Sequence, residues 1–103
     1  MHALPIPRDV LADDDAVHLL GAWIAGEGLH CALNYGFFEG NGHDEAQAWG
    51  SVLADMIRHI AMAHAHHGGA PEAETIATLM AALQAGLDDP QEPSEGEFVA
   101  RPH

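Results

Sequence analysis

The chain has 103 residues and a formal net charge of −13, from 16 Asp and Glu against 3 Lys and Arg. This length suits one small domain, which buries a modest fraction of its surface and would gain stability from a partner chain. The charge would repel nucleic-acid backbones and anionic membranes, so we expect neither as a partner, whereas a basic protein partner is compatible with it.

The N-terminal residues MHALPIPRDV lack the basic and apolar regions of a signal peptide. No apolar run approaches the length of about 18 residues that a transmembrane helix needs. The single cysteine, Cys31, allows no intrachain disulfide, which fits a reducing compartment. These features predict a cytoplasmic protein.

The first segment of the chain, residues 1–15, is predicted to be an extended lead-in. Pro5 and Pro7 favour extended backbone, with at most one short helical turn around Val10–Ala12. The acids Asp13–Asp15 lack the spacing and the central glycine of an EF-hand loop, so we interpret them as a solvated turn.

Residues 16–38 predict a β-hairpin, because two apolar runs flank Gly26-Glu27-Gly28. A two-residue type II′ turn through Gly26-Glu27 would set Ala25 opposite Gly28 and Ile24 opposite Leu29. One face of the second strand then consists of Leu29, Cys31, Leu33, Tyr35 and Phe37.

The other face of the hairpin would carry Leu19, Trp23 and His30. A three-residue turn would instead shift the register by one residue and exchange the two faces of the first strand. With either turn the first strand is apolar on both sides, and an isolated hairpin is barely stable, so each face needs cover.

Two helices follow the hairpin and the loop EGNGHD at 39–44. Asp44 is a suitable N-cap for the first helix, and Gly68-Gly69 is a suitable stop. Its apolar stripe recurs at spacings of three and four, through Trp49, Val52, Leu53, Met56, Ile57 and Ile60. Pro71 suits the first turn of the second helix, whose stripe is Ile76, Leu79, Met80, Leu83 and Leu87.

The sequence therefore predicts an α+β fold, β-β-α-α, as a single domain over residues 1–87. Residues 88–103 contain three prolines and five acids and are predicted to form a flexible acidic tail. Phe98 and Val99 are the apolar residues of that tail that could dock on the domain.

Three segments together carry a resemblance to a known family: LPIP (4–7), LLGAWIAGEGLHCAL (19–33) and AWGSVLADMIRHIAMAHA (48–65). They resemble a family of short proteobacterial proteins classed as a domain of unknown function. The resemblance covers about residues 4–87 and implies a small α+β fold. It implies no activity.

The segment RHIAMAHAHHGG, residues 58–69, holds four of the nine histidines. His64 and His67 lie three residues apart, which one helix can present to a metal ion. His59 and His66 are two turns apart, roughly 10 Å along the axis, and cannot share that ion. Zinc needs a third ligand, for which His43 is a candidate, with Asp44 and Cys31 as further donors.

The structural interpretation of these histidines is favoured over a zinc or other divalent-metal site. A cation in the last turn of a helix complements the helix dipole, and an imidazole can bond a free carbonyl. A pH response is a third possibility, because histidine changes charge near neutral pH. No cofactor is predicted.

The other candidates for chemistry are weaker. Cys31 is predicted to be a buried and inert thiol, since it lies on an apolar strand face. Ser51, one helical turn before Asp55, has no base placed beside it by the sequence, so a catalytic triad has no support.

The main hypothesis is an interaction or structural module without catalysis that forms a homodimer. Leu19, Trp23 and His30 are the candidate interface, because their face of the hairpin needs cover and the strand edges could pair with a second copy. The alternative is a ligand- or metal-binding protein, or a minor enzyme, that uses His64 and His67 with His43.

Overall fold

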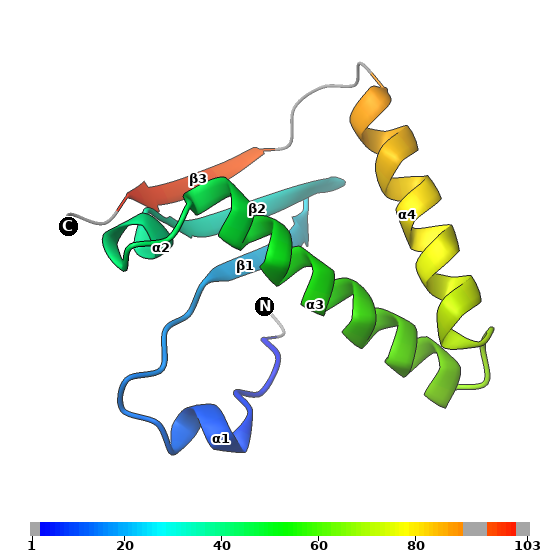
Figure 1. Cartoon of the computed structure of the whole chain (residues 1–103), viewed down its shortest axis with the longest axis horizontal. Helices are drawn as coiled ribbons and strands as arrows, with labels where there is room; N and C mark the ends of the chain where they lie inside the picture. Colours follow the sequence, from blue (N-terminus) through cyan, green and yellow to red (C-terminus); the bar gives the residue numbers. More distant parts are fainter. Residues whose placement is uncertain (1–2, 90–94, 101–103) are drawn as a thin grey trace.

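The computed structural model describes residues 3–89 and 95–100 of the chain. Two helices, α3 and α4, form a V, and a small sheet lies beside the first arm of the V (Figure 1). In chain order the elements are α1 (Arg8–Leu11), β1 (Leu20–Ala25), β2 (Gly28–Tyr35), α2 (Phe37–Gly40), α3 (Glu45–His66), α4 (Glu72–Asp88) and β3 (Glu95–Ala100).

The hairpin of β1 and β2 has the predicted register. Ala25 pairs with Gly28 and Ile24 pairs with Leu29 in an antiparallel ladder. The turn type differs from the prediction: Gly26 has φ 55° and Glu27 has φ 67°. Two positive φ angles define a type I′ turn rather than type II′. Both types have two-residue loops and give the same register, so the faces are as predicted.

The second strand ends earlier than the alternation of apolar residues predicts. Gly36 has φ 95°, a left-handed conformation that leaves the strand geometry. The chain then enters the short helix α2, so Phe37 lies on that helix and not on the strand face to which the sequence assigns it. Its ring packs edge-on against Phe38, with centroids 5.3 Å apart.

Both ends of α3 are closed by local hydrogen bonds. At the start, the Asp44 carboxylate accepts from the Gln47 N–H at 2.8 Å, which confirms the predicted N-cap. At the end, Gly68 has φ 86°, and the Gly69 N–H donates to the His64 carbonyl at 2.8 Å. With the Gly68 N–H donating to Ala65 at 3.2 Å, this is a Schellman motif, as the Gly-Gly pair predicts.

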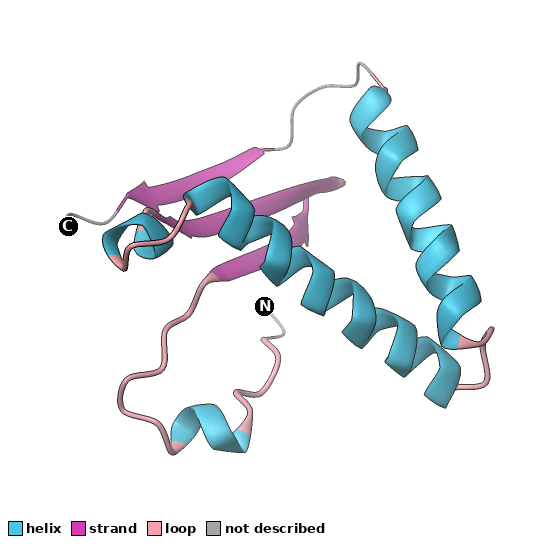
Figure 2. Ribbon diagram, viewed as in Figure 1, coloured by secondary structure: helices cyan, strands magenta, loops and turns pink. Residues whose placement is uncertain are grey.

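The second long helix, α4, begins after Pro71 and folds back at an angle to α3 (Figure 2). Ala61 on α3 is fully buried, and Thr75 on α4 is 8% exposed. The rest of the predicted apolar stripe of α4 contributes less to packing, because Met80, Leu83 and Leu87 are exposed. A hairpin followed by two long helices confirms the predicted α+β class.

The structure adds a strand within the segment that the sequence analysis treats as a tail beyond residue 87. β3, Glu95–Ala100, pairs in parallel with β2, so the sheet order is β1-β2-β3. A parallel pair needs a long connection, here through α2, α3 and α4, and no local pattern reveals it.

The N-terminal arm, residues 3–18, runs out beyond β1 and carries α1 (Figure 1). No residue of α1 is buried, and Leu4 is 90% exposed. A four-residue helix is too short to be stable by itself, so the arm needs another surface to pack against.

The chain is open rather than densely packed. Its Cα radius of gyration is 15.7 Å, whereas a compact domain of this length has about 13 Å. Among the described side chains, Ala61 is the one buried apolar residue. None of the described helices is long and apolar enough to cross a membrane.

Candidate interaction surface

The predicted interface residues Leu19, Trp23 and His30 lie on one face of the hairpin. Trp23 and His30 are direct cross-strand partners, and Leu19 precedes Trp23 by four residues. The Trp23 ring lies across its own strand over Gly21, where a Cβ would collide with it. Gly21 therefore provides the space for the indole, which is 39% exposed.

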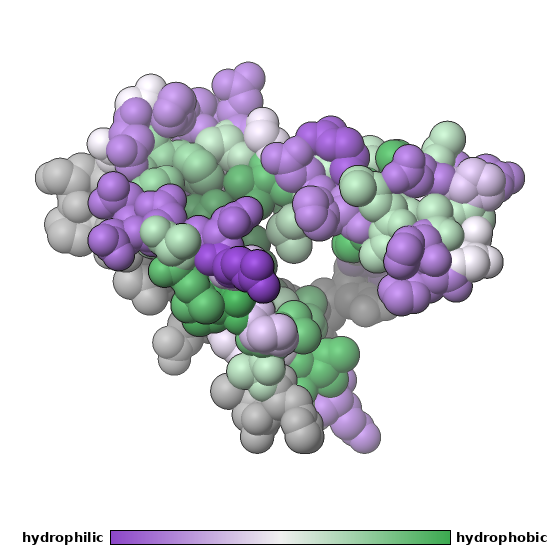
Figure 3. All heavy atoms as spheres, turned by 90° about the horizontal axis from the view of Figure 1, so that it is seen from below, coloured by the Kyte–Doolittle hydropathy of each residue, from purple (hydrophilic) through white to green (hydrophobic). Residues whose placement is uncertain are grey.

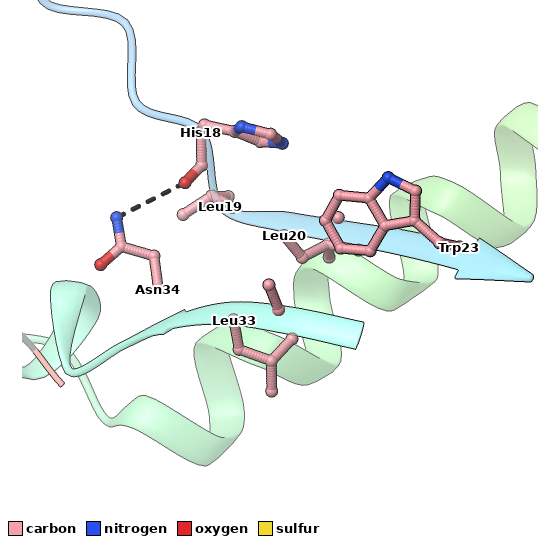
Figure 4. A pocket seen from close by; sticks show the side chains of 8 residues that line it. His18, Leu19, Leu20, Trp23, Leu33 and Asn34 are labelled. Atoms are coloured by element: carbon pink, nitrogen blue, oxygen red, sulfur yellow. Dashed lines mark hydrogen bonds between the residues drawn. The ribbon is translucent and has the colours of Figure 1, made fainter. Parts of the chain in front are cut away.

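A shallow pocket of about 330 Å³ opens beside Trp23. Figure 4 shows Leu19, Leu20, Trp23 and Leu33 around it, with His18 and Asn34 at one end. The Asn34 Nδ2 donates to the His18 carbonyl at 3.5 Å, while Asn34 Oδ1 is buried and accepts no hydrogen bond from the described residues. The pocket is thus mainly apolar, and the buried acceptor Asn34 Oδ1 lies at that end.

A second hollow, of about 530 Å³, lies along α3 and is called here the α3 groove. Its lining residues are Leu19, Val52, Asp55, Met56, His59 and Ile60. Leu19 lines both hollows, so the apolar surface continues from the hairpin to the helix. Figure 3 shows hydrophobic side chains exposed on one face of the molecule, beside an open hollow.

The junction of β2, α2 and α3 is held by a buried carboxylate, Glu45, which is 7% exposed. Its Oε2 accepts from the Gly36 N–H at 2.8 Å and from the Trp49 Nε1–H at 2.7 Å, and its Oε1 accepts from the Glu39 N–H at 2.8 Å. The Trp49 ring also packs edge-on against Phe38, with centroids 5.6 Å apart.

The protonation of Glu45 follows from these contacts. Burial raises the pKa of the Glu45 carboxyl. Hydrogen bonds from the backbone of Gly36, Glu39 and Phe38 and from the Trp49 indole together lower this pKa by more than burial raises it, so the pKa lies below its ordinary value. An ionised carboxylate whose oxygens already accept three hydrogen bonds is a structural clasp rather than a general acid. In the sequence Glu45 directly follows the predicted N-cap Asp44, and the spacing Glu45-x-x-x-Trp49 is the one local sign of the contact.

The histidine segment is a helix terminus in the structure. The His64 ring lies against Gly69, where a Cβ would collide with it, and the rings of His66 and His67 meet edge-on with centroids 5.3 Å apart. His43 lies before the opposite end of α3, and a helix of 22 residues is about 33 Å long. One copy of the chain therefore does not bring His43 to His64 and His67.

Within residues 3–89, no three His, Cys, Asp or Glu side chains gather as a metal site. Asp55, which the sequence places one turn from His59, pairs with Arg58 instead. The Ser51 hydroxyl donates to the Gln47 carbonyl at 3.3 Å, and Cys31 is half-buried. The Asp15 N–H donates to the Asp13 carboxylate at 2.9 Å, which fits a turn.

Residues 3–91 match a family described as Domain of unknown function (DUF5076). The chain belongs to this family. The match covers the hairpin, the Ala48-Trp49-Gly50 segment and both long helices, so the Glu45–Trp49 contact lies within the family region. No curated protein matches the chain.

Among solved structures, the chain resembles one described as a putative pyruvate dehydrogenase from the photosynthetic bacterium Rhodopseudomonas palustrus CGA009. The two share 27% sequence identity with a TM-score of 0.67, over 92% of this chain and 93% of the other. The similarity therefore extends over nearly the whole of both chains.

Proposed function

We propose that this family member is an interaction or structural module that functions as a homodimer, in which a second copy covers the apolar surface that one copy leaves open. The observation that carries the proposal is the exposed area. The chain exposes 8599 Å², whereas a compact monomer of 10.9 kDa exposes about 5,600 Å².

The excess area is large enough for a stable interface. It amounts to roughly 3,000 Å² per chain, and a standard interface buries about 800 Å² per partner. Part of the excess belongs to the extended arm, and the rest is spread over the hairpin and the helices.

The exposed residues are of the kind that interfaces bury. Large apolar side chains are exposed on the arm, on the hairpin and on both long helices, among them Leu11, Ile24, Leu29, Met56, Ile60, Met80 and Leu87. Monomeric proteins rarely expose apolar surface that is continuous over several elements, and such surface marks sites of association.

Catalysis is not part of the proposal. Glu45, the buried carboxylate, is engaged in the fold. Among the described residues no three His, Cys, Asp or Glu side chains form a cluster that would support applying the pyruvate dehydrogenase description of the Rhodopseudomonas protein to this chain. The histidine pair at the end of α3 remains the alternative, as a metal or ligand site that would need donors from another copy or another molecule.

Sedimentation equilibrium at micromolar concentration tests the homodimer. We expect a mass of twice 10.9 kDa. Because both copies carry a formal charge of −13, the dissociation constant should fall when the salt is raised from about 50 mM to about 500 mM, since salt screens their repulsion. A monomer at every concentration and salt would overturn the proposal, and a complex with a basic partner should instead weaken in salt.

A further inference from the structure

The outer edge of β1 is unpaired within the described chain. The sheet order β1-β2-β3 occupies both edges of β2 and leaves one edge of β1 open. The Asn34 N–H donates to the Leu19 carbonyl at 2.8 Å, which makes these two residues a hydrogen-bonded pair. Because such pairs alternate along an antiparallel ladder, Leu20, Ala22 and Ile24 direct their N–H and C=O groups outward.

This edge lacks the features that normally prevent pairing. The strand reads LGAWIA, without charge or proline, and its ladder to β2 runs without a bulge. Natural proteins protect open edges with charged residues, prolines or bulges, so an unprotected apolar edge indicates a pairing site. The strand at the other margin of the sheet, β3, contains Glu95 and Glu97, which disfavour pairing with a second acidic copy.

We propose that two copies join through β1, antiparallel, about a two-fold axis at Ala22. The inference rests on the proposed homodimer and specifies its seam. Ala22 pairs with Ala22 of the second copy, Leu20 pairs with Ile24 of the second copy, and the two sheets become one six-stranded sheet in the order β3-β2-β1-β1-β2-β3. An isologous contact of this kind closes after two copies, so it gives a dimer and not a fibre.

The side chains fit this register on both faces. On one face Ile24, which is 84% exposed in the single chain, gains Leu20 of the second copy as a neighbour. On the other face the axis sets Trp23 opposite Gly21 of the second copy, and the indole of that copy lies over the same glycine. The two Trp23 rings therefore adjoin across the seam, and each ring lies over a glycine that has no side chain.

The N-terminal arm lies on the same side of the sheet as the proposed seam. Figure 1 shows it running out beyond β1, on the side opposite β3. The arm contains the exposed apolar residues Leu4, Ile6 and Leu11, so apolar surface beyond the strand itself is available to a second copy on that side of the sheet.

The axis at Ala22 allows a charge-exchange experiment. Ala22→Lys and Ala22→Glu each place two like charges directly opposite each other, so each variant by itself should self-associate at least about tenfold more weakly than the parent chain. An equal mixture of the two should recover dimers, with native mass spectrometry showing the mixed species in excess over either homodimer. Leu29→Lys is the matched control: it adds the same charge on the same sheet face, but on the inner strand β2, and should leave the dimer intact.

The outcomes separate this inference from the proposed function. If the parent chain is a dimer and both Ala22 variants dimerise normally, or if the mixture fails to recover dimers, the β1 seam is wrong and the homodimer stands. If the parent chain is a monomer, both fail. If circular dichroism shows that the variants do not fold, Ala22→Cys in a Cys31→Ser chain decides: oxidation should link the two copies, because the paired Cα atoms would be about 5.5 Å apart. Absence of that link would overturn the seam.

Discussion

Replacing Gly68 by Ala tests whether the histidine segment is a helix terminus. Gly68 has φ 86°, and a Cβ added there would meet nothing within 4 Å. The cost of Gly68→Ala is therefore that of the left-handed backbone, about 1 to 2 kcal/mol. For a domain of this size each kcal/mol shifts the melting temperature by about 4–8 °C, so we expect a decrease of about 4–16 °C.

The chain offers a matched control for this substitution in Gly86. Gly86 lies within α4, and a Cβ there also meets nothing within 4 Å, but its φ is not in the left-handed range. Gly86→Ala should therefore raise the melting temperature by about 4–8 °C, since Ala is better than Gly in a helix by about 1 kcal/mol. Both are measured by circular dichroism at one protein concentration, because dimerisation makes the melting temperature depend on it. If Gly68→Ala were neutral or stabilising, the assignment of a left-handed helix terminus would be refuted.

Three further predictions concern single sites. Glu45→Gln should lower the melting temperature at pH 7 and flatten the decline of the melting temperature in acid. The lowered pKa of Glu45 in the folded state stabilises the fold at pH values above the ordinary carboxyl pKa of 4.5, and this stabilisation is lost as the pH falls through the folded-state pKa. Glu39→Gln, on an exposed side chain, should change neither property, and an equal effect of the two substitutions would contradict the role of Glu45. Glu27→Asn should raise the stability by a few tenths of a kcal/mol to about 1 kcal/mol in chemical denaturation, because Asn tolerates the positive φ that the turn requires; a loss would argue against the type I′ turn. Protein purified without a nickel column should contain no stoichiometric zinc by elemental analysis and should melt unchanged with added zinc, whereas one zinc per chain that is lost in His64→Ala and His67→Ala would establish the alternative function.

The clasp at Glu45 gives a physical role to Trp49 in the segment Ala48-Trp49-Gly50, which lies within the region that matches the family. Trp49 donates to the carboxylate, and its ring packs edge-on against Phe38, while the same carboxylate binds the backbone at Gly36 and Glu39. One buried charge thus connects the end of β2, the short helix α2 and the start of α3. Removing the charge leaves backbone donors without their acceptor, and unsatisfied buried donors are costly.

The sequence by itself determined those features whose chemistry is local. The Asp44 cap and the Gly68-Gly69 stop set both ends of α3, since each closes hydrogen bonds within a few residues. A two-residue turn set the hairpin register and, through the alternation of strand side chains, placed Trp23 beside His30. The family resemblance on residues 4–87 is confirmed by the match over residues 3–91.

Only the tertiary structure decided the features that join distant segments. The Glu45 contacts depend on where Gly36 and Glu39 come to lie, and β3 joins β2 across three intervening helices. The three-dimensional arrangement also separated His43 from His64 and His67 by the length of α3. It left the helices and the hairpin with exposed apolar faces, although the periodicity of their sequences marks those faces for burial. Periodicity specifies which residues need cover, but the surface that covers them depends on the packing of whole elements, and here we infer that it belongs to a second copy.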